Sequence, residues 1–337
     1  MSCPTHRLAL LLSITALAVG CASGESDKST DTASGEGEGE GEGEGEGEGE
    51  GEDGLPEGMR PLATPSGACP DLTTSGFVTL DSAGQERHAT IVVPSAPAGP
   101  MSLVFFFHGL MDPGSTPEPT EYMASALDLQ AMADATDAVI VLPEAPIYDL
   151  FGFQFFLWDI ALETDADLIL FDDLRACGAD QLDLDLARTT AWGFSGGALW
   201  TTVMASQRGD AFAAIVEASG GSDISVPIWP EPAAAYETPA HKMPALLMSG
   251  GDLDVWPDPS LTIVDFEAAT DTLTDQLSAD GHTVVRCWHD AGHTITNAGF
   301  QLTIDWLLSH TFGEPSPWAG GDLGDDSDWC ELVNAGI

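Results

Sequence analysis

Short apolar runs alternate with longer segments of helical periodicity over most of the chain beyond residue 75. The runs at 101–109 and 138–143 are dominated by apolar side chains, which is typical of strands buried on both faces of a parallel sheet. Residues 76–94 are organised around a Ser-Ala-Gly turn, which predicts two strands joined at that turn. Further buried strands are expected at 188–194, 212–220, 244–251 and 282–288.

Segments with helical spacing separate these strands. Between residues 121 and 136, apolar side chains recur on related faces of a helix. Four more helices are expected at 163–177, 196–207, 261–279 and 298–310. Because buried strands alternate with helices, we expect an α/β fold with a mainly parallel central sheet and helices on both faces. In such sheets, reactive groups lie at the carboxyl ends of the strands.

The first 58 residues follow a different pattern. Residues 1–20 carry Arg7 ahead of an apolar run too short to span a bilayer, which predicts a signal peptide. The ending LAVGC resembles a bacterial lipobox, so Cys21 is the candidate for lipidation, and the protein is expected to be lipid-anchored to the cell envelope or secreted. Gly-Glu alternation makes 21–58 a disordered, extended tether ahead of one α/β domain at 59–337.

Charge and cysteine content narrow the class of protein. The formal net charge is -46, with nine lysines and arginines together, which excludes nucleic acid as a partner because phosphate contacts need basic side chains.

Beyond Cys21 the chain has Cys69, Cys177, Cys287 and Cys330. An even number in an exported protein predicts two disulfides, and the sequence leaves three pairings open. No metal or organic cofactor is expected, since no cysteine pair has the close spacing of a zinc site.

The segment Gly193-Phe194-Ser195-Gly196-Gly197 matches G-x-S-x-G. A predicted strand precedes Ser195 and a predicted helix follows it, which is the context in which a strained turn exposes a nucleophilic serine. The alternative is a serine that merely caps the helix. The histidine that such a serine needs is expected at His293, in the loop after the strand at 282–288.

A carboxylate that orients the histidine is expected in the loop after the strand at 244–251. Its spacing from the glycine pair favours Asp254, with Asp252 as the alternative. Folds that carry such triads differ in the order of the three residues along the chain. The order serine, acid, histidine found here is typical of one of these folds. The backbone N–H groups of Gly196 and Leu110 are expected to form an oxyanion hole. His108 is expected to shape the loop that carries Leu110. Trp158 and Trp256 are candidates for substrate binding.

Four stretches together resemble one known family. They are FFFHGL, DDLRACGADQLDLDLARTTAWGFSGGALW, MSGGDLDVW and AGHT, and the resemblance runs from about residue 76 to 310. They are similar to the secreted polyhydroxybutyrate depolymerase and feruloyl esterase-like branch of the α/β-hydrolases. The resemblance implies the α/β-hydrolase fold, with nucleophile, acid and base at Ser195, Asp254 and His293. Leu110 stands where the family often has a cysteine.

The residues and the resemblance together lead to one expected activity. We expect a serine esterase that acts on polyhydroxyalkanoate, or on aryl or acetyl esters of the plant polysaccharide type, without a cofactor. The ester substrate, small or polymeric, is the expected partner, and the membrane is contacted only through the lipid anchor. The alternatives are a peptidase or amidase with the same triad, and a non-catalytic surface lipoprotein that binds a partner. A full triad in the correct order argues against the last.

Overall fold

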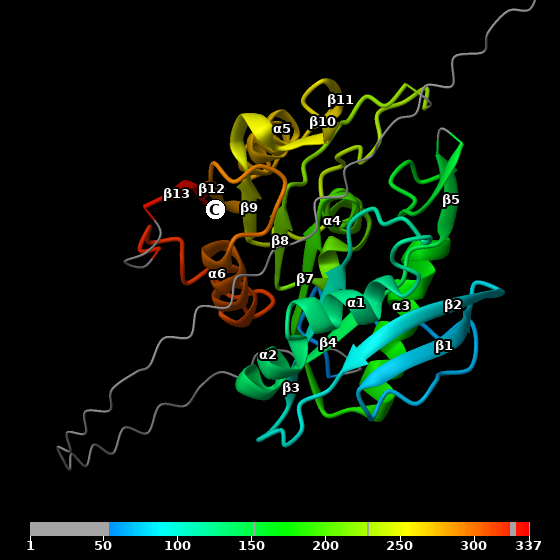
Figure 1. Cartoon of the computed structure of the whole chain (residues 1–337). Helices are drawn as coiled ribbons and strands as arrows, with labels where there is room; N and C mark the ends of the chain where they lie inside the picture. Colours follow the sequence, from blue (N-terminus) through cyan, green and yellow to red (C-terminus); the bar gives the residue numbers. More distant parts are fainter. Residues whose placement is uncertain (1–53, 151, 228, 324–327, 337) are drawn as a thin grey trace, which may run out of the picture.

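The central feature of the fold is a nine-stranded sheet (Figure 1). The computed structural model describes residues 54–150, 152–227, 229–323 and 328–336. The strand order is β1-β2-β4-β3-β7-β8-β9-β12-β13. The strands are β1 (Gly76–Ser82), β2 (Gln85–Val92), β3 (Met101–Phe107), β4 (Ala138–Pro143), β7 (Leu184–Phe194), β8 (Ala214–Ala218), β9 (Ala245–Ser249), β12 (Thr283–Trp288) and β13 (Cys330–Ala335).

The middle of this sheet is parallel. The strands from β4 to β12 all pair in parallel, whereas β1, β2 and β13 pair antiparallel at the two edges. The predicted α/β class with a mainly parallel sheet is therefore confirmed. The last strand was not predicted: β13 lies beyond β12, so the strand that leads to His293 is not at the sheet edge.

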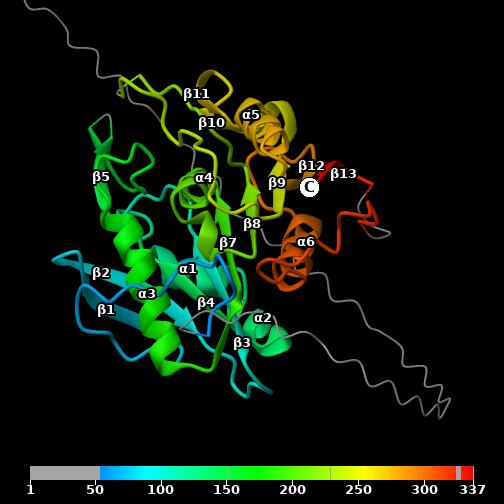
Figure 2. The same ribbon diagram turned by 180° about the vertical axis from the view of Figure 1, so that it is seen from behind.

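Helices cover both faces of the sheet (Figure 2). They are α1 (Pro119–Ala126), α2 (Leu129–Thr136), α3 (Ala166–Gln181), α4 (Gly196–Arg208), α5 (Phe266–Ala279) and α6 (Asn297–Leu308). Side chains along β3 alternate between two hydrophobic clusters: Phe105 and Phe107 belong to the cluster that includes residues of α3, α4 and α5, and Val104 and Phe106 belong to the one that includes residues of α1, α2 and α6. The all-apolar pattern of the central strands therefore reflects burial on both faces.

Two predicted helices have different limits in the structure. The helix expected at 121–136 is interrupted at Asp128, which has left-handed backbone angles (φ 49°), so two short helices result. The helix expected at 261–279 begins only at Phe266, after Asp265 caps it by accepting from the Ala268 N–H. Leu261–Asp265 form strand β11 instead, because the β-branched run Thr-Ile-Val favours an extended backbone.

The two disulfides settle the pairing that the sequence left open. Cys69 bonds to Cys177 in α3, and Cys287 in β12 bonds to Cys330 in β13. The first bond fixes the segment before β1 against a helix, and the second fixes the antiparallel edge strand to its neighbour. Two structural disulfides are typical of proteins that fold in an oxidising compartment outside the cytosol.

The described residues begin at residue 54, before the predicted start of the domain at residue 59. Leu55 and Met59 are buried against Phe312, and the Arg60 guanidinium pairs with Asp172 and Asp210. The expected signal peptide, Cys21 and nearly all of the expected tether lie outside the described residues. Within the residues that are described, no helix has the length and apolar character needed to cross a membrane.

Three segments outside the sheet lie over the carboxyl ends of its strands. We call them the cap: residues 144–165, which contain the hairpin of β5 (Ile147–Leu150) and β6 (Phe153–Phe156); the loop 224–234; and residues 250–265, which contain the hairpin of β10 (Val255–Asp258) and β11 (Figure 1). Neither hairpin was predicted, because each lies between elements of the main sheet and has no long periodic pattern of its own.

Candidate active site

Ser195 lies at a sharp turn between β7 and α4. Its backbone angles (φ 56°, ψ −124°) are ones that a residue with a side chain rarely adopts. The turn is held because the Ser195 N–H donates to the carbonyl of Ala218 at 3.0 Å. Gly193 and Gly197 are required here, since a Cβ on Gly193 would collide with the Gly197 carbonyl, and one on Gly197 with the Phe107 carbonyl. The turn that was predicted from the motif is present.

The structure brings Ser195, His293 and Asp254 together in one chain of hydrogen bonds. The Oγ of Ser195 lies 2.8 Å from Nε2 of His293, and Nδ1 of His293 lies 2.7 Å from Oδ1 of Asp254. Asp254 is fully buried, whereas Asp252 is exposed. Nδ1–H donates to the carboxylate, which leaves Nε2 with the lone pair that can take the serine proton.

Two aromatic rings hold the imidazole of His293 between them. Phe194 stacks at 5.0 Å between ring centroids and Phe266 at 4.5 Å. Phe194 directly precedes the serine, and Phe266 begins α5 and donates its N–H to the Asp254 carbonyl at 2.9 Å. The same elements that carry the serine and the acid therefore fix the plane of the ring.

Asp254 is held by donors on its other oxygen. Oδ2 accepts from the Ser219 hydroxyl at 2.8 Å and from the Gly250 N–H at 2.7 Å. These two hydrogen bonds fix the orientation of the buried carboxylate. Ser219, which follows β8 in a turn with positive φ (54°), was not predicted from the sequence. The run Ala-Ser-Gly-Gly-Ser directly after an apolar strand could have indicated it.

A buried carboxyl supports the turn that carries Ser219. Glu217 is completely buried in β8, and burial raises the pKa of its carboxyl to about 8. Oε2 accepts from the Gly221 N–H at 2.9 Å, and Oε1 lies 2.8 Å from the Thr202 hydroxyl, which also lies 2.8 Å from the Gly221 carbonyl. If Glu217 is protonated, it donates to Thr202, Thr202 donates to the carbonyl, and every group is satisfied.

We expect the substitution Glu217→Gln to remove a pH dependence of stability. The folded-state pKa of about 8 exceeds the ordinary value of 4.5, so between these values the folded protein holds a proton that the unfolded chain has released. The free energy of unfolding therefore falls as the pH rises through this window. An amide keeps all the hydrogen bonds and cannot ionise. At pH 9 the variant should exceed the parent in stability, on the order of a few kcal/mol, and at pH 5 the two should be nearly equal.

Urea unfolding under non-reducing conditions at pH 5, 7 and 9 measures this difference. Glu86→Gln, on the exposed face of β2, is the control, because groups common to all three proteins cancel in the comparison. A stability difference between Glu217→Gln and the parent that stays constant with pH would contradict the buried proton.

The two backbone N–H groups expected to form an oxyanion hole lie next to each other. A Cβ built on Gly196 would lie 3.2 Å from the Leu110 nitrogen, and one built on Gly109 would lie 3.1 Å from the Ser195 Cβ. Gly196 is the first residue of α4, so its N–H has no acceptor within the helix. The loop that carries Leu110 is fixed by backbone hydrogen bonds between Met111 and Phe156 of β6.

His108 orients the peptide between Gly109 and Leu110. Its Nε2 accepts from the Ala145 N–H at 3.1 Å, so Nδ1 carries the proton and donates to the Gly109 carbonyl at 2.7 Å. Burial lowers the pKa of His108 to about 4, which keeps the ring neutral. In a trans peptide the C=O and the next N–H point in opposite directions, so the Leu110 N–H points away from His108. Trp158 adds a third contact, since its Nε1 donates to the His108 carbonyl at 2.9 Å.

We expect His108→Ala to lower kcat for an ester about 10- to 100-fold with little change in KM, because it removes the hydrogen bond that orients an oxyanion donor. The matched control is His310→Ala. His310 is equally buried, its pKa is also lowered to about 4, and it bonds to Trp306 and Ser316. Both variants should lose stability, and only the first should lose kcat. Equal effects on kcat would show that His108 acts only through stability.

An apolar cavity of about 50 Å³ opens at Ser195. Apart from Ser195 and Gly196 its walls are apolar side chains, and they come from the core, the oxyanion loop and all three parts of the cap. Lining residues are Leu110, Leu150, Leu157, Ile160, Leu199, Val226, Trp229, Trp256, Ile263, Val264 and Phe266. Trp256, one of the two tryptophans singled out from the sequence, therefore lies at the cavity.

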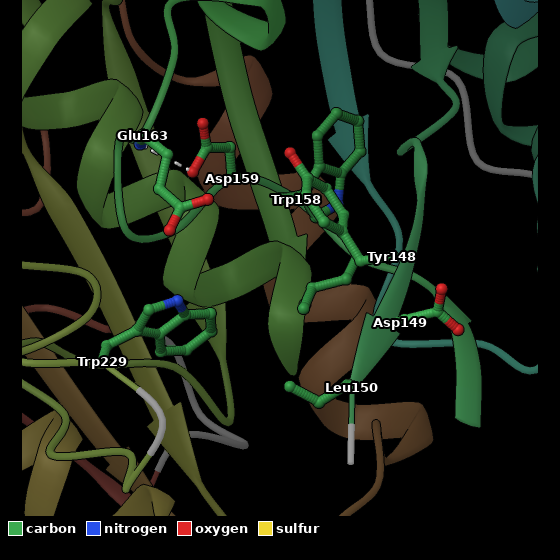
Figure 3. A pocket seen from close by; sticks show the side chains of 8 residues that line it. Tyr148, Asp149, Leu150, Trp158, Asp159, Glu163 and Trp229 are labelled. Carbon is green, nitrogen blue, oxygen red and sulfur yellow. Dashed lines mark hydrogen bonds between the residues drawn. The ribbon is translucent and has the colours of Figure 1, made fainter. Parts of the chain in front are cut away.

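A second cavity of about 200 Å³ shares the walls Leu150, Leu157 and Trp229 with the first. Figure 3 shows the carboxylates of Glu163 and Asp159 on one side of this cavity and the indole of Trp229 on another. Trp158 borders this second cavity and not the first. Its ring is almost fully buried and stacks on Trp200, so it packs in the core and lies one cavity away from the serine.

Comparisons with known proteins agree on the fold. No protein-family model matches the chain, and no curated protein matches it. Among solved structures, native sOPH is similar with a TM-score of 0.61 and 16% identity, over 79% of this chain and 98% of the other. Native pOPH has the same score and identity over 79% and 96%. A serine-to-alanine variant of pOPH solved with pNPB is equally similar. The sheet order, the turn at Ser195 and these likenesses show that the chain has the α/β-hydrolase fold.

Proposed function

We propose that the protein is a serine hydrolase that cleaves carboxylic esters. The observation that supports this most directly is the hydrogen-bonded chain from Ser195 through His293 to buried Asp254, located at a strained turn beside two backbone N–H groups. A serine that only capped the helix would need neither partner. The solved structures that resemble the chain share its fold, and the activity is inferred from the site.

The geometry performs the reaction in two steps. Ser195 Oγ attacks the ester carbonyl carbon while His293 Nε2 takes its proton, and Asp254 stabilises the imidazolium. The N–H groups of Gly196 and Leu110 stabilise the negative charge on the carbonyl oxygen. His293 then returns the proton to the departing alcohol, which leaves an acyl group on Ser195. Water, activated by the same histidine, releases the acid.

The cavity supports an ester with an apolar acyl group. Its walls offer no charged side chain and almost no polar atom, so a charged or strongly polar acyl group would lose its hydration there without compensation. This fits polyhydroxyalkanoate and aryl or acetyl esters, which are the substrate classes we propose. The two disulfides support export, and we propose that Cys21 carries the lipid anchor.

A fluorophosphonate probe and a set of matched substrates test the proposal together. We expect the probe to label Ser195, and we expect turnover of p-nitrophenyl acetate and butyrate with much slower turnover of the octanoate ester, because the cavity is small. The p-nitroanilide of butyrate separates an esterase from an amidase. Labelling without hydrolysis of any ester would remove the esterase proposal, and absence of labelling would remove the nucleophile as well.

A further inference from the structure

Three side chains separate the cavity at Ser195 from the larger cavity beside it. Leu150, Leu157 and Trp229 line both cavities, so each of them faces the space at the serine on one side and the second space on another. We call these three residues the dividing wall. The cavity at the serine holds about 50 Å³, whereas the one beyond the wall holds about 200 Å³. The larger of the two spaces therefore lies on the far side of the wall from the nucleophile.

The dividing wall is built where two parts of the cap pack together. Leu150 ends β5 and Leu157 directly follows β6, whereas Trp229 comes from the loop after β8. Leu150 and Leu157 are buried members of one small hydrophobic cluster, and Trp229 packs against that cluster. The Leu157 N–H donates to the Pro146 carbonyl at 3.0 Å, and the Trp229 N–H donates to the Val226 carbonyl at 3.0 Å. Backbone bonds therefore fix each segment, and apolar contact between side chains closes the wall.

The spaces on the two sides of the wall differ in polarity. The cavity at the serine is almost entirely apolar, whereas the second cavity is also lined by the acidic residues Asp149, Asp159 and Glu163 (Figure 3). Oδ1 of Asp159 accepts from the Glu163 N–H at 3.0 Å, and Oδ2 accepts from the Thr164 N–H at 2.7 Å, so this carboxylate is held by the protein itself. The wall therefore closes a small apolar space against a larger polar one.

We infer that the dividing wall sets the length of acyl chain that the protein accepts, with Trp229 as the main specificity-determining residue. The inference deepens the proposed function and rests on it. An acyl chain that outgrows the cavity at Ser195 toward the wall meets the apolar atoms of Leu150, Leu157 and Trp229 and stops there. Trp229 has the largest side chain of the three and is only half-buried, so its removal opens the wall without emptying the core.

A shortened wall gives a longer chain access to the second cavity. The chain would then leave water beside the remaining wall residues and the ring of Trp158, which also lines that cavity. Each methylene group that is buried in this way should raise kcat/KM about fourfold, provided that it is buried in the transition state as well. Acetate and butyrate esters are short enough to need no such space.

The ratio of kcat/KM for p-nitrophenyl octanoate to kcat/KM for p-nitrophenyl butyrate tests the inference, because a change in the chemistry at Ser195 affects both esters and cancels. Trp229→Ala should raise this ratio about tenfold or more, since at least two methylene groups gain a buried site. Leu157→Ala should raise it in the same direction. The matched control is Leu199→Ala, which removes the same group from a buried leucine that lines only the cavity at the serine. Its gain should not exceed about fourfold, which corresponds to one methylene group.

A second substitution tests where the longer chain goes. Tyr148 lines only the second cavity and is half-buried, so a larger ring at this position takes up space in that cavity alone. In the parent, Tyr148→Trp should leave the octanoate-to-butyrate ratio within about twofold, because the wall is closed. In the Trp229→Ala background it should reduce the gain about threefold or more, and this coupling is what a shared cavity requires.

Three results would overturn the inference. They are an unchanged octanoate-to-butyrate ratio in folded Trp229→Ala, equal gains in Leu157→Ala and Leu199→Ala, and a gain in Trp229→Ala that Tyr148→Trp does not reduce. If Trp229→Ala does not fold, the two leucine variants decide. Turnover of butyrate with an unmoved ratio removes the inference and leaves the esterase proposal intact. A parent that hydrolyses none of the esters removes the proposed function and the inference with it.

Discussion

Replacing Ser195 by alanine is expected to lower kcat for p-nitrophenyl butyrate about 10⁶-fold. The hydroxyl oxygen is the atom that forms the acyl-enzyme, and it is this hydroxyl that lies within hydrogen-bond distance of Nε2 of His293. A residual acceleration of about 10³- to 10⁴-fold over water should remain, because the N–H groups of Gly196 and Leu110 still stabilise the charge on the carbonyl oxygen.

The triad acts as a unit, and this gives a second test of the same prediction. His293→Ala alone should cost nearly as much as Ser195→Ala, and the double variant should be no slower than either one. The control is Ser222→Ala, which removes another buried hydroxyl, one bonded to Gln276. It should keep normal kcat. Stopped-flow or steady-state assays of the parent and the four variants measure these losses, and additive losses in the double variant would argue against a shared mechanism.

The central sheet could be predicted from the sequence because its strands are buried on both faces. Burial of that kind removes polar residues from runs such as 101–107 and 138–143, which leaves a signal that depends on local composition alone. The turn at Ser195 could be predicted for a similar reason. Its glycines are dictated by close backbone contacts within a few residues of the serine and with β3, so the requirement is written into a short motif.

The features that escaped prediction depend on contacts between distant residues. Ser219 belongs to the site only because β8 lies between β7 and β9 and places its turn next to Asp254, 35 residues away in sequence. Glu217 looks like a misplaced charge in an apolar strand until Thr202 and Gly221 are seen around it. The pairing of Cys287 with Cys330 requires the antiparallel edge strand β13, which has no buried residue along its length and therefore no apolar run that would indicate it.

The two tryptophans of the cap are a further case in which contacts between distant residues decide the environment of a side chain. Trp158 and Trp256 were both candidates for substrate binding, but the sequence could not tell which ring borders the cavity at Ser195 and which packs in the core. In the structure Trp158 is almost fully buried with its indole N–H bonded to a backbone carbonyl, whereas Trp256 lies at the cavity. The burial of Trp158 arises from neighbours in β3, the loop after it and α4, namely Phe107, His108 and Trp200, none of which is near in sequence.

Replacing Asp254 by asparagine is expected to lower kcat about 10⁴-fold at neutral pH, although the side chain keeps its shape. The reason is a conflict among donors. The Gly250 N–H can only donate, and it bonds to Oδ2, so the amide oxygen of asparagine must take the Oδ2 position. Its NH₂ group then replaces Oδ1 and faces Nδ1 of His293. Nδ1 must give up its proton to accept this bond, and the ring proton moves to Nε2.

A protonated Nε2 cannot accept the proton of Ser195, so the base is lost even though no atom has moved far. Asp252→Asn is the matched control. That side chain is exposed two residues away, and its substitution should leave kcat within about twofold of the parent. The assay is p-nitrophenyl butyrate hydrolysis at pH 7. Equal losses of kcat in both variants would show that the charge of the loop matters and not the tautomer of His293. A loss of kcat in Asp252→Asn alone would show that Asp252 is the acid of the triad. A loss of kcat confined to Asp254→Asn is the expected result, because the donors on Oδ2 dictate which ring nitrogen of His293 carries the proton.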